Sequence, residues 1–255
     1  MKEYDVLVIA DTQVSNTSDT RHLESLARYI WKHKPGTIIH IGDHWDFESL
    51  SSYASVLESE GRRLVNDLAG GERALQLIMD YSRERNSKSK KASVYRPQLH
   101  FIKGNHENRL DRYIENNPVL EGLIDIDGFI EREGWEVHDF LKPLFIHDIC
   151  FVHYLAAAQS GRPVGGSIEN KLNKFPHSFV HGHQQQYQMG TRQNLLGKPH
   201  FGVCAGAFYI DDEGYRGANN TEKRGFVHLK AFTNRYGYLD HDVLFTSLER
   251  LMQEY

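Results

Sequence analysis

Short apolar runs that end in polar residues recur along the first two thirds of this chain. Residues 4–11, YDVLVIAD, and residues 36–43, GTIIHIGD, are rich in β-branched side chains and are bounded by turn residues, as buried strands are. Between them, the apolar residues of 21–33 recur at helical spacing, with Ser18 and Asp19 as candidate caps. A strand, a helix and a second strand in this order predict a parallel crossover, and therefore an α/β fold.

The same pattern predicts further elements downstream. The expected strands are 98–105, a hairpin-like pair in 144–154, a strand in 177–186, and additional strands in 200–210 and 224–232. Residues 57–85 have a helical pattern interrupted at Gly70-Gly71, which leaves two helices or one broken helix open. Residues 86–97 lack apolar periodicity and are expected to form an exposed loop, and the chain should end in a short helix. Because no repeat or linker divides the sequence, we expect a single domain over residues 1–255.

Composition narrows the functional classes. The chain has 255 residues, 40% of them hydrophobic, which is enough for one large core. A net charge of -4 argues against a protein that coats nucleic acid through bulk positive charge. Cys150 and Cys204 lie in apolar stretches and are expected to be buried free thiols in a reducing compartment. The apolar run near the first residue is too short for a signal peptide or a membrane span, so we expect a cytoplasmic protein without membrane contact.

The polar ends of the predicted strands share one chemical property. Each offers an oxygen or nitrogen that can bind a divalent metal, and the five residues concerned are Asp11, Asp43, Asn105, His153 and His183. One such residue alone is typical of a turn or a helix cap, and a lone His147 is typical of a structural histidine. Strand ends of an open α/β sheet form the crevice in which ligands bind. We therefore expect the five residues to converge on one site.

In this order the polar ends resemble those of the calcineurin-like metallophosphoesterases, whose pattern is D-x-H, G-D-x-x-D, G-N-H-E, a lone H and G-H-x-H. The matching stretches are ADTQ (10–13), GDHWD (42–46), GNHE (104–107), FVHY (151–154) and HGHQQ (181–185). The resemblance implies a four-layer α-β-β-α sandwich with mixed sheets and two divalent metal ions at the strand ends. The stretch GDHWDF also resembles members of the family that bacteriophages encode.

Two positions depart from the family pattern, because Gln13 and Gln185 stand where the family has histidines. The resemblance implies a first metal bound by Asp11, Gln13, Asp43 and Gln185, and a second bound by Asp43, Asn105, His153 and His183. Two amides in place of two imidazoles make the first site richer in oxygen, which favours Mn²⁺ or Mg²⁺ over Zn²⁺ or Fe. We therefore expect Mn²⁺. As an alternative, His181 reaches the metal instead of Gln185, since it is two residues before His183 and so on the same strand face.

A pair of metals bridged by Asp43 suits phosphate chemistry. Ions roughly 3.5 to 4 Å apart activate a water molecule and neutralise charge on a phosphoryl group. The sequence has no nucleophile elbow, phosphate-binding loop or dinucleotide fingerprint. We therefore expect hydrolysis of a phosphoester substrate, either a monoester or a diester. The resemblance implies that His106 is the catalytic residue that protonates or stabilises the leaving oxygen.

Neighbouring residues have open assignments. Glu107 is expected to orient a histidine of the site, and His44 and Asp46 to shape the loop after Asp43. Arg109 either clamps a phosphate oxygen or pairs with an acid on a solvated helix face. Tyr209 lies in a polar stretch that can border the crevice.

Two other functions remain open at this point. Six basic residues in 83–96 can bind a nucleic-acid backbone, which would make the protein a nuclease, although an exposed flexible loop is the simpler explanation because Tyr95 is almost the only aromatic residue among them. A non-catalytic metal-binding scaffold is the other alternative, and the presence of His106 argues against it. The glycine-rich residues 160–167 are expected to form a lid or a surface loop. The natural substrate and the oligomeric state are left open.

Overall fold

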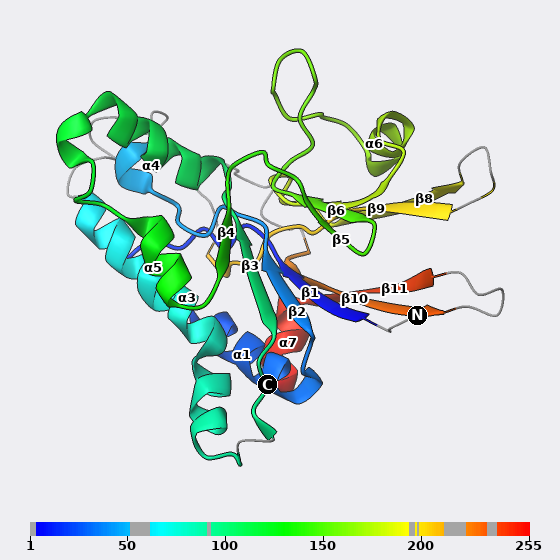
Figure 1. Ribbon diagram of the computed structural model, residues 1–255, viewed down its shortest axis with the longest axis horizontal. Helices are drawn as coiled ribbons and strands as arrows, with labels where there is room; N and C mark the ends of the chain where they lie inside the picture. Colours follow the sequence, from blue (N-terminus) through cyan, green and yellow to red (C-terminus); the bar gives the residue numbers. More distant parts are fainter. Residues whose placement is uncertain are drawn as a thin grey trace.

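The computed structural model describes residues 4–51, 62–90, 93–193, 197, 199–211, 223–233 and 239–255 (Figure 1). Within this part of the chain two β-sheets pack face to face, and helices cover the outer face of each. The arrangement is the predicted four-layer α-β-β-α sandwich with mixed sheets.

The first sheet carries the N-terminal strands at its centre. Its order is β11-β10-β1-β2-β3-β4. Four of its strands are parallel: β1 (Tyr4–Ile9), β2 (Thr37–His40), β3 (Gln98–Ile102) and β4 (Glu136–His138). The C-terminal strands β10 (Gly225–Thr233) and β11 (Leu239–Ser247) join on the other side of β1 as an antiparallel pair. The ends of β1, β2 and β3 therefore reach the same rim of the sheet.

The second sheet has the order β5-β6-β7-β9-β8. Its three inner strands are parallel: β6 (Ile149–Val152), β7 (Ser178–His181) and β9 (Pro199–Cys204). Its edges are the antiparallel strands β5 (Leu144–Ile146), which forms the predicted hairpin with β6, and β8 (Gln188–Gln193). A second set of parallel strand ends is thus available to the site.

Two apolar layers hold the sandwich together. Between the sheets, Val6 and Val8 of the first sheet pack with Phe151 and Val180 of the second in one fully buried cluster. The outer face of the first sheet is covered by α1 (Arg21–His33), α3 (Leu64–Ser87), α4 (Asn105–Asn116), α5 (Ile126–Arg132) and α7 (Leu248–Glu254). The outer face of the second sheet is covered by α6 (Ile168–Lys174). Two 3₁₀ turns, η1 (Glu48–Leu50) and η3 (Pro118–Leu120), complete the described elements.

The predicted interruption at Gly70-Gly71 is wrong, because α3 is continuous from Leu64 to Ser87. The two glycines serve close packing. A Cβ at Gly70 would lie 2.9 Å from the backbone of Asn16, and a Cβ at Gly71 would lie 2.0 Å from Nε1 of Trp45. Residues 57–61 of the expected helix lie outside the described residues.

Several other expectations are confirmed. Helix 21–33 has the predicted bounds, the β1-α1-β2 crossover is parallel, and both cysteines are free thiols, although Cys204 is buried as expected and Cys150 is only half-buried. The predicted cap is displaced: the N-cap is Thr20, while the carboxylate of Asp19 accepts the N–H of Arg21 at 3.0 Å. No helix in the described part of the chain is both long enough and apolar enough to cross a bilayer.

Substituting Gly71 by alanine tests the packing of α3. Alanine adds up to about 1 kcal/mol of helix propensity. Overpacking against the buried Trp45 costs about 1–3 kcal/mol, so we expect a net loss of stability. Urea unfolding followed by circular dichroism measures it. Gly165→Ala, where an added Cβ meets nothing within 4 Å, is the matched control and should leave the midpoint almost unchanged. A stabilised Gly71→Ala protein would contradict the packing argument.

Candidate metal centre

The five polar strand ends meet where the rims of the two sheets come together. Within each sheet, backbone hydrogen bonds tie neighbouring ends, from Asp11 N–H to Gly42 C=O at 3.1 Å and from Gly182 N–H to His153 C=O at 2.9 Å. Two further bonds cross between the sheets. The N–H of His183 donates to Oδ2 of Asp11 at 2.9 Å, and Nδ1 of His153 donates to the carbonyl of Ile41 at 2.8 Å. The predicted convergence is therefore present in the structure.

Three glycines allow this close approach. A Cβ at Gly42 would lie 2.4 Å from the backbone nitrogen of Gly104, so the loops after β2 and β3 touch through their backbones. A Cβ at Gly104 would lie 2.2 Å from Oδ1 of Asp43, and one at Gly182 would lie 2.5 Å from Oδ2 of Asp11. Each glycine precedes or faces a predicted ligand, and a larger residue would displace that ligand.

Four of the predicted ligands have left-handed backbone conformations. The φ angles are 49° at Asp11, 42° at Gln13, 52° at Asp43 and 65° at His183. Such conformations cost roughly 1–3 kcal/mol each and persist only where the surroundings fix them. Here the left-handed conformations lie at the strand ends, where they turn the side chains toward one another.

Asp43, Asn105, His153 and His183 form the tightest group. Because Nδ1 of His153 donates to a carbonyl, its Nε2 faces the group, 2.9 Å from Oδ1 of Asn105 and 3.4 Å from Oδ2 of Asp43. Atoms of Asp43, His153 and His183 that can ligate a metal lie within 4.8 Å of one another. Three atoms that all accept hydrogen bonds need a proton or a cation between them. The residues present therefore fit a divalent ion.

The charges of this group agree with that fit. Asp43 and His153 are almost fully buried. Burial alone would raise the pKa of Asp43, but His106 and His153 hold it below its usual value. Burial alone would lower the pKa of His153, but Asp43 raises it to about 9. The buried carboxylate thus draws positive charge to the place where a metal would bind.

The position around Asp11 fits a cation only in part. Asp11 is fully buried, its Oδ1 has no hydrogen-bond partner among the described residues, and burial raises its pKa to about 8. However, the amides of Gln13 and Gln185 bind each other at 2.8 Å, and the hydroxyl of Tyr209 donates to Oε1 of Gln185 at 3.0 Å. Oδ1 of Asp11 could therefore bind an ion without losing a hydrogen bond, whereas the amide of Gln185 would first have to give up its hydrogen bonds to Gln13 and Tyr209.

His106 lies beside the group, at the N-terminus of α4. Its backbone N–H donates to Oδ1 of Asp43 at 2.9 Å, and its Nδ1 lies 3.2 Å from Oδ1 of Asp46. Burial alone would lower the pKa of His106, but Asp43 and Asp46 raise it to about 9. The ring is therefore positioned by one carboxylate and can carry a proton near the other.

Glu107 differs from the expectation that it orients a histidine side chain. It is fully buried, and its carboxylate accepts backbone N–H groups from Asp43, His44, Trp45 and Gly104 at 2.7 to 3.1 Å. One side chain of α4 thus fixes the loop after β2 and the end of the loop after β3. His44 anchors the same loop to its surroundings. Its Nδ1 lies 2.7 Å from Oγ1 of Thr12, and its Nε2 lies 2.9 Å from the carbonyl of Gly71 in α3.

Arg109 lies next to His106 and is anchored on the loop after Asp43. Its Nη1 donates to the carbonyls of Asp46 and Phe47 at 3.2 and 3.3 Å. The expected pairing with an acid on the helix face does not hold the guanidinium here, and the nearby Asp111 pairs with Lys103 instead, at 2.8 Å. Arg109 therefore braces the loop that carries Asp46.

His181 is not part of the metal-ligating group. Strand β7 ends at His181, and the left-handed conformation of His183 breaks the alternation that would have placed both rings on one side. Phe179, which packs with α6, shares the strand face of His181, and Nδ1 of His181 lies 2.8 Å from the carbonyl of Gly182. The structure thus turns this histidine toward α6.

The basic stretch 83–96 lies at the opposite rim from the site. It precedes β3, whereas Asn105 follows β3, so the strand separates the two (Figure 1). The stretch begins in α3, where Arg83 pairs with Asp80 and Glu133 at 3.0 and 2.6 Å. Lys91 lies outside the described residues.

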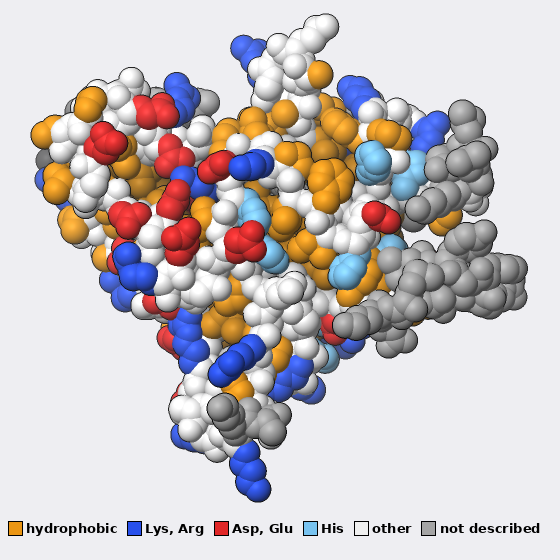
Figure 2. Space-filling view, in the orientation of Figure 1, with side chains coloured by type: hydrophobic (Ala, Val, Ile, Leu, Met, Phe, Trp, Pro, Cys, Tyr) orange, Lys and Arg blue, Asp and Glu red, His pale blue; other side chains and the backbone are white. Residues whose placement is uncertain are grey.

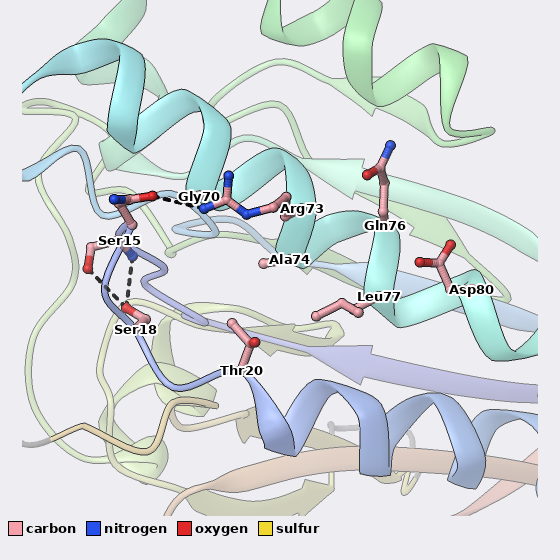
Figure 3. A pocket seen from close by; sticks show the side chains of 10 residues that line it. Ser15, Ser18, Thr20, Gly70, Arg73, Ala74, Gln76, Leu77 and Asp80 are labelled. Carbon is pink, nitrogen blue, oxygen red and sulfur yellow. Dashed lines mark hydrogen bonds between the residues drawn. The ribbon is translucent and has the colours of Figure 1, made fainter.

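A groove of roughly 400 Å³ runs between α3 and the loop before α1 (Figure 3). Arg73 crosses it to bind Oδ1 of Asn16 at 2.8 Å, and Ser15 and Ser18 bind each other on its other wall. None of the predicted ligands lines this groove. The groove and the polar strand ends are thus separate features.

No protein-family model and no curated protein matches the chain. Among solved structures it is similar to YfcE, a phosphoesterase from E. coli, with a TM-score of 0.39 at 8% identity over 96% of this chain and 99% of that one. It is also similar to Vps29 of Chaetomium thermophilum, with a TM-score of 0.40 at 9% identity over 95% of each chain. Likeness at this level says nothing about activity, so the chemistry of the site has to come from its own residues.

Of two further contributions to the site, one was marked in the sequence only as part of a polar stretch and the other was not marked at all. The hydroxyl of Tyr209 reaches Gln185 from the segment after β9, more than twenty residues away along the chain. Thr12, whose Oγ1 lies between His40 at 3.1 Å and His44 at 2.7 Å, stands between two predicted ligands and offers no pattern of its own. Only the spacing D-x-x-D in GDHWD marked Asp46, which faces His106.

Replacing Glu107 by glutamine tests the support of the loops. The amide keeps the shape but places an NH₂ group against backbone N–H groups, and hydrogen bonds to a charged acceptor contribute about 1.5–3 kcal/mol each. We expect a loss of about 2–4 kcal/mol in the free energy of unfolding. Glu115→Gln, at an exposed position of the same helix, is the control. Equal denaturation midpoints for the two variants would show that the carboxylate does not hold the loops.

Proposed function

We propose that this protein is a divalent-metal-dependent phosphoesterase of the calcineurin-like superfamily, acting on a phosphomonoester or phosphodiester. One observation carries the proposal. Asp43, Asn105, His153 and His183 bring carboxylate, amide and imidazole atoms to one point, beside a histidine that is paired with a carboxylate. A proton on His153 can bridge these atoms, and a divalent cation, for which all of them are ordinary ligands, can take its place.

Asp43, Asn105, His153 and His183 would hold the second ion of the expected pair. Asp43 and Asp11, with Gln13 and Gln185, would hold the first ion at lower affinity, because the two amides must separate. When bound, the ions supply Lewis acidity toward phosphoryl oxygens and lower the pKa of a water molecule that attacks phosphorus. The chain's own residues then have two tasks, which are to orient the phosphoryl group and to protonate the leaving oxygen.

His106 is the proposed proton donor. The ring side chain is 14% exposed and lies beside the ligand group, with its Nδ1 3.2 Å from Oδ1 of Asp46. As the ester bond to phosphorus breaks, the leaving oxygen gains negative charge, and the imidazolium of His106 transfers a proton to it. Arg109 fixes the loop that carries Asp46 and adds positive charge beside the departing group.

A hydrolysis assay tests the function. Apoprotein reconstituted with Mn²⁺ is expected to hydrolyse p-nitrophenyl phosphate or bis-p-nitrophenyl phosphate. His106→Ala should lower kcat by about 10²–10⁴ with its metal content unchanged, because only the proton donor is lost. Asp43→Asn should lose bound metal as well as activity. The exposed His177→Ala is the matched control and should behave as wild type. Turnover that is absent with every divalent metal would refute the proposal in favour of a binding scaffold.

Metal preference tests the role of the two glutamines. We propose that oxygen-rich ligands at Gln13 and Gln185 make the wild-type enzyme prefer Mn²⁺ over Zn²⁺. The double substitution Gln13→His and Gln185→His should tighten binding of the weaker ion at least tenfold and shift the preference toward Zn²⁺ or Fe. Calorimetric titration of each ion measures this separately from activity. Unchanged affinities in the double variant would show that these positions do not contact the metal.

A further inference from the structure

A second group of metal-ligating side chains lies at the outer edge of the first sheet. It comprises His100 of β3 with Glu136 and His138 of the edge strand β4. His100 stands directly opposite Glu136, and His138 is the diagonal neighbour, opposite Ile102. Figure 2 shows histidine and acidic side chains together at the surface over β3 and β4.

The alternation of the two strands places all three side chains on one face. Leu99, Phe101 and Val137 pack against the helices on the other side of the sheet. His100, Glu136 and His138 therefore point toward the second sheet, at an edge strand with no further strand beyond it in the described sheet. The two imidazole side chains are only 12% and 14% exposed, whereas that of Glu136 is 67% exposed. Two ligands are thus held by packing and the third is open to solvent.

The distances match the geometry of a small tetrahedral ion. A cation bound at about 2.05 Å by each ligand needs ligand atoms about 3.3 Å apart. Nδ1 of His100 lies 3.2 Å from Nε2 of His138 and 3.3 Å from Oε2 of Glu136. Nε2 of His138 lies 3.9 Å from Oε1 of Glu136. The two Glu136 distances involve different oxygens of its carboxylate, and one ligating atom of each residue lies within 4.8 Å of the others, so the three groups are within reach of one ion.

We propose that His100, Glu136 and His138 bind one Zn²⁺-class divalent cation at a site separate from the strand-end group. Two imidazoles and one carboxylate suit Zn²⁺ or Co²⁺, whereas the oxygen-rich position near Asp11 suits Mn²⁺. His100 precedes Asn105 by five residues of largely extended chain, roughly 15 Å, so the two sites cannot share an ion. The three protein ligands leave a fourth coordination position that faces water.

The ion would clamp the shortest strand of the sheet. Strand β4 has three residues, and the carbonyl of His138 accepts the N–H of Lys103, directly before Gly104. Binding at the edge would therefore fix the segment through which β3 reaches Asn105. The ion stabilises the native chain because the site is assembled only when β3 and β4 pair.

Metal content and Co²⁺ absorption test the proposal on the full chain. Protein stripped with EDTA and titrated with Zn²⁺ should bind one equivalent more than Glu136→Gln or His138→Ala. The Co²⁺-loaded wild type should show the intense visible bands of a four-coordinate ion, and both variants should lose that component. Glu136 is exposed, so its substitution is compatible with folding, and Glu121→Gln and His177→Ala are the matched exposed controls.

The same titration in an Asp43→Asn background separates this site from the strand-end group. The Asp43→Asn protein should still bind one Zn²⁺ equivalent, at His100, Glu136 and His138. Adding Glu136→Gln to this protein should weaken the binding of that Zn²⁺ at least tenfold. Zn²⁺ should also raise the melting temperature of the Asp43→Asn protein but not of the double variant. If Glu136→Gln binds as many ions as Glu121→Gln, with the same affinity, the contact between His100 and His138 is only a hydrogen bond and the proposal is wrong. That outcome would leave hydrolysis at the strand ends untouched.

Discussion

The carboxylate of Glu107 accepts backbone N–H groups from both loops that carry the central predicted ligands. A charged acceptor buried in the interior is expensive unless every lone pair is used, and four amides use them here. The loops after β2 and β3 therefore cannot move independently of α4. Asp43 and His106 keep their positions because the backbone beneath them is fixed by a side chain that is itself fully buried.

The strand ends contain several features that lower the free energy of unfolding of a protein. Asp11, Asp43 and Glu107 are buried carboxylates, and the chain turns through left-handed conformations at residues that carry large side chains. The surrounding sandwich supplies the compensation, since the apolar layer between the sheets is fully buried directly behind the site. The free energy gained by apolar packing thus offsets the cost of the buried charges and the strained backbone at one rim of the sandwich.

Elements with a clear spacing of apolar residues could be predicted from the sequence. Features that depend on contacts with residues distant along the chain could not. Helix 21–33 and the strand ends at Asp11, Asp43 and Asn105 could be located because apolar spacing and terminal polar residues mark them directly. Strand β4 has only three residues and no alternation long enough to detect. Gly70-Gly71 read as an interruption because spacing cannot reveal that Trp45 packs against the helix there. For the same reason, the prediction that His181 and His183 share one side of the strand failed, because a left-handed backbone conformation at His183 is not visible in the residue pattern.

Two hydrogen bonds that cross between the sheets connect the geometry of the site to the packing of the sheets. One joins His183 to Asp11 and the other joins His153 to the carbonyl of Ile41, so each sheet contributes half of the coordination frame. The separation of the metal-binding atoms is then set by the thickness of the apolar layer behind them. A single methylene added or removed in the layer that contains Val8 and Phe151, remote from the polar strand ends, would change that separation. In the proposed metal centre, the ionic radius that the site accepts would therefore depend on how the two sheets pack.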